Sequence, residues 1–141
     1  MKNFTLVSIA IFFTLFVSCS SDDDDAGSQD LIIGKWTLSE RLQNGSTTEL
    51  DDCFKTNTVV FMADGTLKST FHRIANNSCD FSHEAVGTWK NLGNNKYSIT
   101  EGDEEPYYSC EINEAGTVFS IEDRFEFQGE QIIQKDMLVK N

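Results

Sequence analysis

The chain has 141 residues and a formal net charge of −12, with 23 acidic residues against 11 basic ones. This balance argues against nucleic acid as a partner, because proteins neutralise phosphates with Lys and Arg, and it argues equally against a bare anionic membrane surface. Residues 19–141 are long enough for one domain of ordinary size.

Residues 1–18 have the pattern of a secretory signal peptide. Lys2 precedes a nearly unbroken apolar run over residues 6–17, which is too short for a membrane-spanning helix of about 20 residues. The run ends in Phe16-Val17-Ser18-Cys19, which resembles the lipobox of bacterial lipoproteins. That resemblance implies cleavage before Cys19 and lipid on Cys19, an anchor worth about 0.8 kcal/mol per buried methylene. The alternative is a eukaryotic-type signal peptide with an incidental cysteine.

Residues 19–30 are expected to form a solvated tether, because they include no large apolar side chain to pack. Four adjacent carboxylates repel one another and extend such a chain. A serine followed by an acidic run behind the lipidated cysteine resembles the export signal of surface lipoproteins in the Bacteroidota. The resemblance implies an outer-membrane protein facing the cell surface, with the signal formed by Ser21, Asp22, Asp23, Asp24 and Asp25. The alternative is a periplasm-facing lipoprotein with an acidic spacer.

Residues 31–141 alternate between apolar and polar side chains in short runs, which predicts an all-β domain. We expect strands near residues 34–42, 56–62, 66–73, 85–91, 96–100, 107–112, 118–122, 124–128 and 131–139. Turns rich in Gly, Asn and Asp separate them, and Asp123 is expected to break the chain between two strands. Successive hairpins predict a small up-and-down antiparallel β-barrel of about eight strands, with a two-sheet sandwich as the competing architecture.

The period-two pattern also predicts which side chains face inward. Three sets are expected in the interior: Val59, Phe61, Leu67 and Phe71; Gly87, Trp89, Tyr97 and Ile99; and Phe119 with Ile121, paired with Phe125 and Phe127. Barrels of this size are either filled by such side chains or hold one small ligand.

Two Gly-x-Trp motifs occur, Gly34-Lys35-Trp36 and Gly87-Thr88-Trp89. Together with Asp51-Asp52-Cys53, the hairpin over residues 61–67, and Cys79, they resemble the lipocalin-like domain lipoproteins of bacteria over residues 31–100. The resemblance implies a barrel plugged at one end by Trp, with Trp36, Trp89 and Tyr97 in the core or beside a pocket. It implies a small hydrophobic or amphipathic ligand, or a glycan. The chain lacks the terminal helix and Thr-Asp-Tyr motif of larger lipocalins, so a ligand-transport role has little support.

Three cysteines remain after Cys19, in a compartment where disulfides form. We expect Cys53 to pair with Cys79, because Cys53 precedes a strand and Cys79 lies just beyond the polar segment 75–78. Closing a loop of about 27 residues contributes roughly 3.5 kcal/mol in the chain-entropy model. Pairing of either residue with Cys110 is the alternative, and Cys110 otherwise has the pattern of a small buried hydrophobe.

No catalytic motif is recognisable, so we expect no enzymatic activity and no cofactor. His72 and His83 have no zinc-ligand spacing, and residues 101–105 are expected to form a solvated acidic hairpin end rather than a calcium loop. Tyr107 and Tyr108 either begin a strand or stack on a sugar or peptide. Two functions remain open: a binding module, and a structural or protein-interaction lipoprotein of the envelope.

Overall fold

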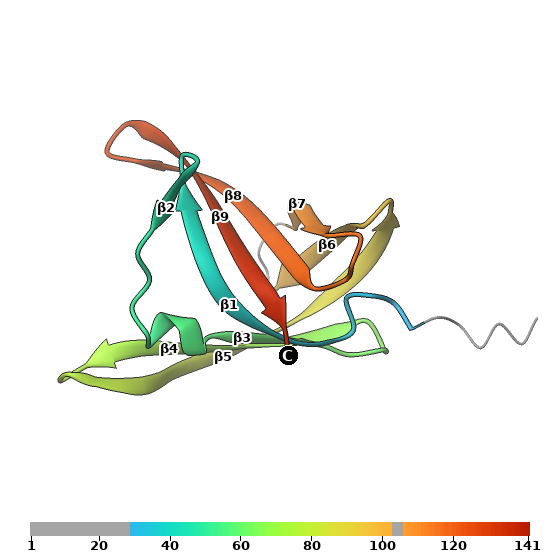
Figure 1. Cartoon of the computed structure of the whole chain (residues 1–141), viewed down its shortest axis with the longest axis horizontal. Helices are drawn as coiled ribbons and strands as arrows, with labels where there is room; N and C mark the ends of the chain where they lie inside the picture. The colour runs from blue at the N-terminus through green and yellow to red at the C-terminus, as the bar shows by residue number, and fades with distance from the viewer. Residues whose placement is uncertain (1–28, 103–105) are drawn as a thin grey trace, which may run out of the picture.

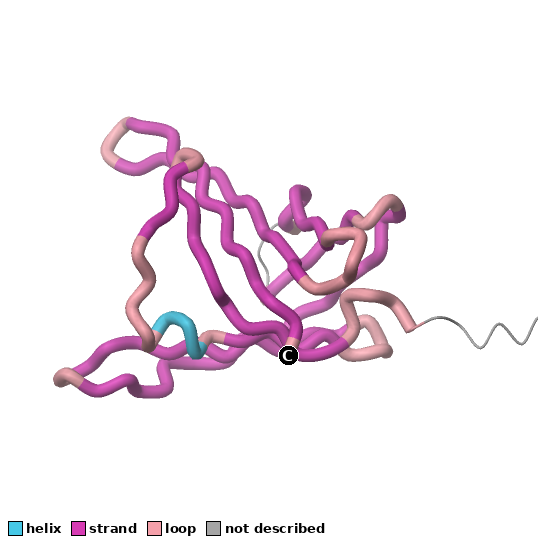
Figure 2. The backbone as a smooth tube through the Cα atoms, viewed as in Figure 1, coloured by secondary structure: helices cyan, strands magenta, loops and turns pink. Residues whose placement is uncertain are grey.

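A computed structural model describes residues 29–102 and 106–141, and this part of the chain is built almost entirely from strands (Figures 1 and 2). The elements in chain order are β1 (Gly34–Gln43), β2 (Ser46–Thr48), the 3-10 helix η1 (Phe54–Thr56), β3 (Thr58–Phe61), β4 (Thr66–Ala75), β5 (Ser78–Gly93), β6 (Lys96–Glu101), β7 (Tyr107–Ile112), β8 (Val118–Phe127) and β9 (Glu130–Lys140). Within the described ranges, no helix is long and apolar enough to span a membrane.

Eight of the strands close into an antiparallel barrel, which confirms the predicted fold. Each strand from β3 to β9 pairs with the next, β1 pairs with β3, and β1 also pairs with β9 to close the ring. Figure 1 shows β1 and β9 lying side by side. The short strand β2 pairs with the far end of β1, from Arg41 to Gln43.

One end of the barrel is closed by a cluster of apolar side chains. The largest fully buried ones are Trp36, Phe61, Tyr97 and Phe119, and the Phe61 and Phe119 ring centres lie 5.4 Å apart. The backbone at Ile32 crosses this end, and its carbonyl accepts a 2.6 Å hydrogen bond from Trp36 Nε1. The inward faces predicted for β3, β4 and β6 are confirmed by this packing.

Gly87 shows why the second Gly-x-Trp motif needs its glycine. A Cβ atom at this position would lie 2.0 Å from the backbone oxygen of Thr100 on β6. Any larger residue would force β5 away from β6.

The predicted break at Asp123 is wrong, because β8 runs through it without interruption. Phe119 pairs with Leu138, and Phe125 pairs with Ile132, so the expected pairing of two short strands is also wrong. The turn occurs at Gln128 and Gly129, both with positive φ. Phe125 and Phe127 are 39% and 59% exposed near this tip, so the prediction that both lie in the interior is wrong.

The β4–β5 hairpin is longer than the sequence indicated. Asn76 and Asn77 both have positive φ and form a tight two-residue turn. The residues that follow return at once into β5, so Cys79 lies in that strand opposite Ile74 instead of after a polar loop. In Figure 1 the tips of the β4–β5 and β8–β9 hairpins both extend on the left of the barrel.

The predicted disulfide between Cys53 and Cys79 is confirmed, with Cα atoms 5.3 Å apart. It fastens the connection between β2 and β3, which includes η1, to the outer part of the β4–β5 hairpin. Cys110 is fully buried in the core, as expected, and burial raises the pKa of its thiol to about 12.

Candidate functional site

The barrel holds a cavity of about 150 Å³ between the apolar plug and the open end. Its apolar lining comes from six residues: Leu38, Val59, Phe71, Ile99, Ile121 and Leu138. Its polar lining includes Arg41, Asn57, Glu101, Asp123, Gln134 and Asp136.

The apolar and polar lining residues occupy different depths. On β6, β8 and β9 the inward position after the apolar residue is acidic: Glu101 follows Ile99, Asp123 follows Ile121, and Asp136 lies one inward position from Leu138. On β8, Phe119 lies in the plug and pairs with Leu138 of β9, whereas Ile121 pairs with Asp136. In each of the three strands the charged residue therefore lies farther from the plug than the apolar residue. The cavity therefore has an apolar floor and a charged rim.

A β-bulge in β1 brings Arg41 into this rim. The register of β1 against β9 shifts between Leu38 and Glu40, so that Leu38 faces Leu138 but Arg41 faces Asp136. Bulges commonly redirect side chains in this way. The guanidinium donates two hydrogen bonds to the carboxylate, from Nε at 2.6 Å and from a terminal nitrogen at 2.7 Å. The bonds to Asp136 raise the pKa of Arg41, so it remains a cation.

Glu101 is held by a hydroxyl that crosses a strand. Ser69 on β4 is only 1% exposed, and its hydroxyl donates a hydrogen bond to the Glu101 carboxylate on β6. Between them on β5 lie Ala85, opposite Ser69, and Gly87, opposite Glu101. These small residues leave the space through which Ser69 reaches Glu101.

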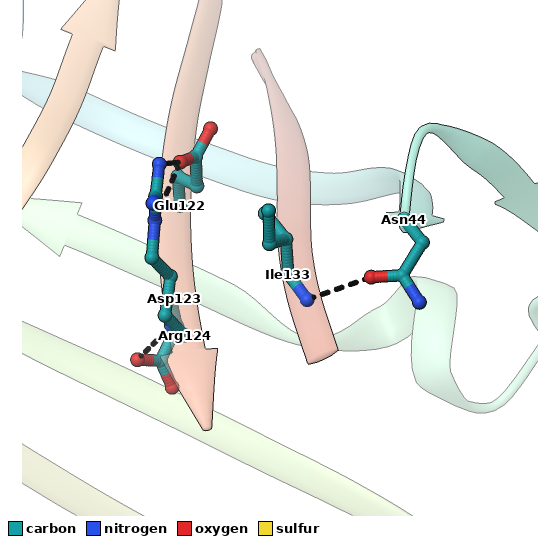
Figure 3. Close-up of polar contacts among 5 residues, drawn as sticks. All are labelled: Asn44, Glu122, Asp123, Arg124 and Ile133. Carbon is teal, nitrogen blue, oxygen red and sulfur yellow. Dashed lines mark hydrogen bonds and ion pairs between the residues drawn. The ribbon is translucent and has the colours of Figure 1, made fainter. Parts of the chain in front are cut away.

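Asp123 is positioned by its own strand. One carboxylate oxygen accepts a 2.7 Å hydrogen bond from the backbone N–H of Arg124. The Arg124 side chain instead pairs with Glu122, at 2.9 Å (Figure 3). Figure 3 also shows the Ile133 N–H donating to Asn44 at 2.9 Å, which links the end of β1 to β9 beside the rim.

The residues proposed from the sequence lie mostly outside this cavity. Trp36 and Tyr97 are buried in the plug, and Trp89 is half-buried against it. Tyr97 donates a 2.7 Å hydrogen bond to Asp30, and burial together with this bond raises the pKa of Tyr97. Trp89 Nε1 donates to the Met62 carbonyl at 2.9 Å.

The other proposed residues lie where side chains are not described. Tyr107 and Tyr108 belong to β7, but their side chains are outside the described part. Cys19 and the segment Ser21 to Asp25 precede the described residues, and Asp103, Glu104 and Glu105 of the acidic loop fall in the gap. In the described ranges, no group of three His, Cys, Asp or Glu residues is arranged to hold a metal ion.

The rim residues were missed by sequence reasoning, although part of the signal was present. Ile99-x-Glu101 and Ile121-x-Asp123 place a carboxylate at an inward position beyond an apolar one. Arg41 gave no such signal, because an uninterrupted strand with Trp36 and Leu38 inward would turn it outward.

The comparison with protein families agrees with this architecture. The family model of the lipocalin-like domain matches residues 32–119. The chain belongs to this family. A solved structure described as odorant binding protein OBP1 is similar at 12% sequence identity and a TM-score of 0.42, over 81% of this chain and 74% of that one. No curated protein matches the chain significantly.

Proposed function

We propose that this lipocalin-like protein is a binding module that takes one small amphipathic molecule into the mouth of its barrel. The observation that carries the proposal is the cavity with an apolar floor and a charged rim. Ligand sites in proteins combine these two features, since apolar walls supply affinity and a few polar groups orient the ligand. The proposed function is ligand binding, without a chemical reaction.

The size of the cavity limits the ligand. Drug-sized molecules need pockets of about 300 Å³ or more, and this cavity measures about 150 Å³. An engineered cavity of about 150 Å³ holds a single benzene ring. We therefore propose a ligand with one ring or a short chain, together with a polar group at the rim.

A second candidate is a protein-interaction role, and exposed apolar side chains favour it. Ile74 and Phe81 lie near the tip of the β4–β5 hairpin, and Phe125 and Phe127 near the tip of the β8–β9 hairpin; all four are exposed. Exposed apolar groups of this kind mark contact surfaces when they gather into patches. The alternative of a glycan ligand came from Tyr107 and Tyr108, whose side chains lie outside the described part of the chain.

The ligand proposal is tested by native mass spectrometry of the full protein purified from its own source. We expect a retained small molecule. A cavity-filling variant, Ile121→Phe, should lose it, whereas Val86→Phe, at an exposed site on β5, should keep it. Absence of any retained mass, with no thermal shift from small amphipathic compounds, would favour the protein-interaction role.

We also propose that lipid on Cys19 anchors the protein to the outer membrane. The support is the apolar run that ends in Phe16-Val17-Ser18-Cys19. Cys19→Ala should release the protein from membranes and remove the mobility shift that lipid causes. Membrane retention without any change in mobility would contradict the anchor.

Surface display is proposed from Asp22 to Asp25 behind Ser21. Replacing the four aspartates by Ala should leave the protein lipidated but protected from protease added to whole cells. Unchanged accessibility would reduce this run to a spacer.

A further inference from the structure

We infer that the ligand of the barrel cavity is a small cation, namely an ammonium group joined to one aromatic or aliphatic ring by a short linker. The inference rests on the proposed binding function and adds the charge of the ligand. It is argued from the partners of the four ionisable side chains that line the cavity: Arg41, Glu101, Asp123 and Asp136.

The rim has an excess of negative charge. Arg41 is the one basic side chain among the described lining residues, and both of its contacts are with Asp136, at 2.6 and 2.7 Å. This two-point pair leaves no net charge on that side of the rim. Glu101 and Asp123 then leave the lining with a formal charge of −2, on a protein whose net charge is −12.

Neither of these two carboxylates pairs with a basic side chain among the described residues. Glu101 accepts a hydrogen bond from the neutral Ser69 hydroxyl, and Asp123 accepts one from the Arg124 backbone N–H. The nearby Arg124 guanidinium is paired with Glu122, which is the neighbour of Asp123 on the other face of β8. A cationic ligand would supply the missing positive charge.

The two carboxylates are also held in place before a ligand arrives. Ser69 is almost fully buried in the wall of the barrel, and the hydrogen bond from its hydroxyl fixes the position of the Glu101 carboxylate. Asp123 is fixed by its hydrogen bond to the next backbone amide. Such prior positioning reduces the entropy lost when the ligand binds.

The floor determines the rest of the ligand. Phe71, Ile99, Ile121 and Leu138 bound a space about the size of one ring. An anionic ligand fits this cavity poorly, since Arg41 would have to leave Asp136 and the anion would lie beside two further carboxylates. A neutral ligand would fill the floor but gain nothing from the rim charge.

The test compares three ligands of similar shape but different charge. These are 2-phenylethylamine, 2-phenylethanol and 3-phenylpropanoate, titrated calorimetrically into the full-length protein at pH 7 and low salt. We expect the amine to bind at least about tenfold more tightly than the alcohol, which corresponds to about 1.4 kcal/mol. The acid should bind more weakly than either, and added salt should reduce the preference for the amine.

Variants connect this preference to the two carboxylates. Glu101→Gln and Asp123→Asn should each weaken amine binding several-fold while leaving the alcohol unchanged, and the Gln amide oxygen can still accept from Ser69. Glu114→Gln is the matched control, because Glu114 is an exposed carboxylate in the turn at the closed end. It should leave all three affinities unchanged.

Each other outcome has a distinct meaning. Equal binding of amine and alcohol would overturn the charge inference and leave the binding function standing. Tightest binding of the acid would also overturn it and would assign ligand recognition to Arg41. Binding of none of the three would overturn the inference together with the proposed function.

Discussion

The closed end of the barrel is filled by aromatic and aliphatic side chains, whereas the open end holds a cavity ringed by charged groups. Both ends are built from the same strands, and the change takes place between one inward position and the next, as from Ile121 to Asp123. Close packing at the first end stabilises the fold. At the second end the like charges of Glu101, Asp123 and Asp136 repel one another, and the proposed binding function accounts for their presence there.

The largest effect on stability is expected for Trp36 in the plug. This side chain is fully buried, contacts Phe119 at 5.8 Å between ring centres, and donates to the Ile32 carbonyl. Trp36→Ala should lower the free energy of unfolding by about 3–5 kcal/mol, as measured by urea denaturation. Phe71→Ala, beside the cavity, should lower it less because that ring is only half-buried. Equal losses would show that the mouth contributes as much to stability as the plug.

The second largest effect is expected for the disulfide near the mouth. Replacing Cys53 and Cys79 by Ser should lower the free energy of unfolding by about 2–4 kcal/mol. Amide exchange should accelerate in the connection between β2 and β3 and not at the plug.

Non-reducing peptide mapping should recover Cys53 joined to Cys79, with Cys110 alkylated only after unfolding, because that thiol is buried and its pKa is raised to about 12. Mapping of either residue to Cys110 would contradict the strand pairing.

A smaller effect is expected for the Arg41–Asp136 pair, in which both side chains are about three-quarters buried. Arg41→Met should lower the free energy of unfolding by about 1–2 kcal/mol, between the values for exposed and buried pairs, because Asp136 loses its cation. The double variant with Asp136→Leu should recover most of this loss. A double-mutant cycle gives the coupling energy of the two side chains. A coupling energy near zero would show that the ion pair does not stabilise the folded protein.

Sequence reasoning was sufficient for the apolar interior and not for the charged rim. Alternation predicted the inward residues of β3, β4 and β6, both those in the plug and those that line the cavity floor, because their apolar pattern is uninterrupted. Asp123 was expected to end a strand, since Asp is a common turn residue that takes positive φ at low cost. It continues β8 because its inward position lies at the rim of the cavity, where its carboxylate is half-buried instead of enclosed in the plug. The bulge before Arg41 has no glycine or proline to announce it and arises only when β1 meets β9, a pairing between distant parts of the chain.

The carboxyl group of Asp30, which accepts a hydrogen bond from Tyr97 in the plug, makes the stability of the protein depend on pH. Burial alone would raise the pKa of its carboxyl, but hydrogen bonds from Tyr97, Asn91 and the Ile32 amide, with the charge of Lys140, together lower it below the ordinary value. A lowered pKa in the folded state stabilises the protein above about pH 4, and this contribution is lost as the pH falls through the folded-state pKa. Asp30→Asn should lower the free energy of unfolding by about 1 kcal/mol at pH 7. The difference from the parent protein should shrink in denaturation curves below pH 4, and a constant difference would contradict this linkage.

The smallest effect on stability is expected for Asp123 at the rim of the cavity. Asp123 is half-buried near Asp136 and Glu101, which line the same cavity. Asp123→Asn removes one negative charge from this group, and the amide oxygen can still accept from the Arg124 N–H. The free energy of unfolding should therefore stay within about 0.5 kcal/mol of the parent value or rise slightly, as read from urea denaturation at low salt, while binding of 2-phenylethylamine falls. A side chain that strengthens ligand binding but lowers the free energy of unfolding is typical of a functional site. A large loss of stability would instead place Asp123 among the groups that hold the barrel together, and the division between the two ends would fail there.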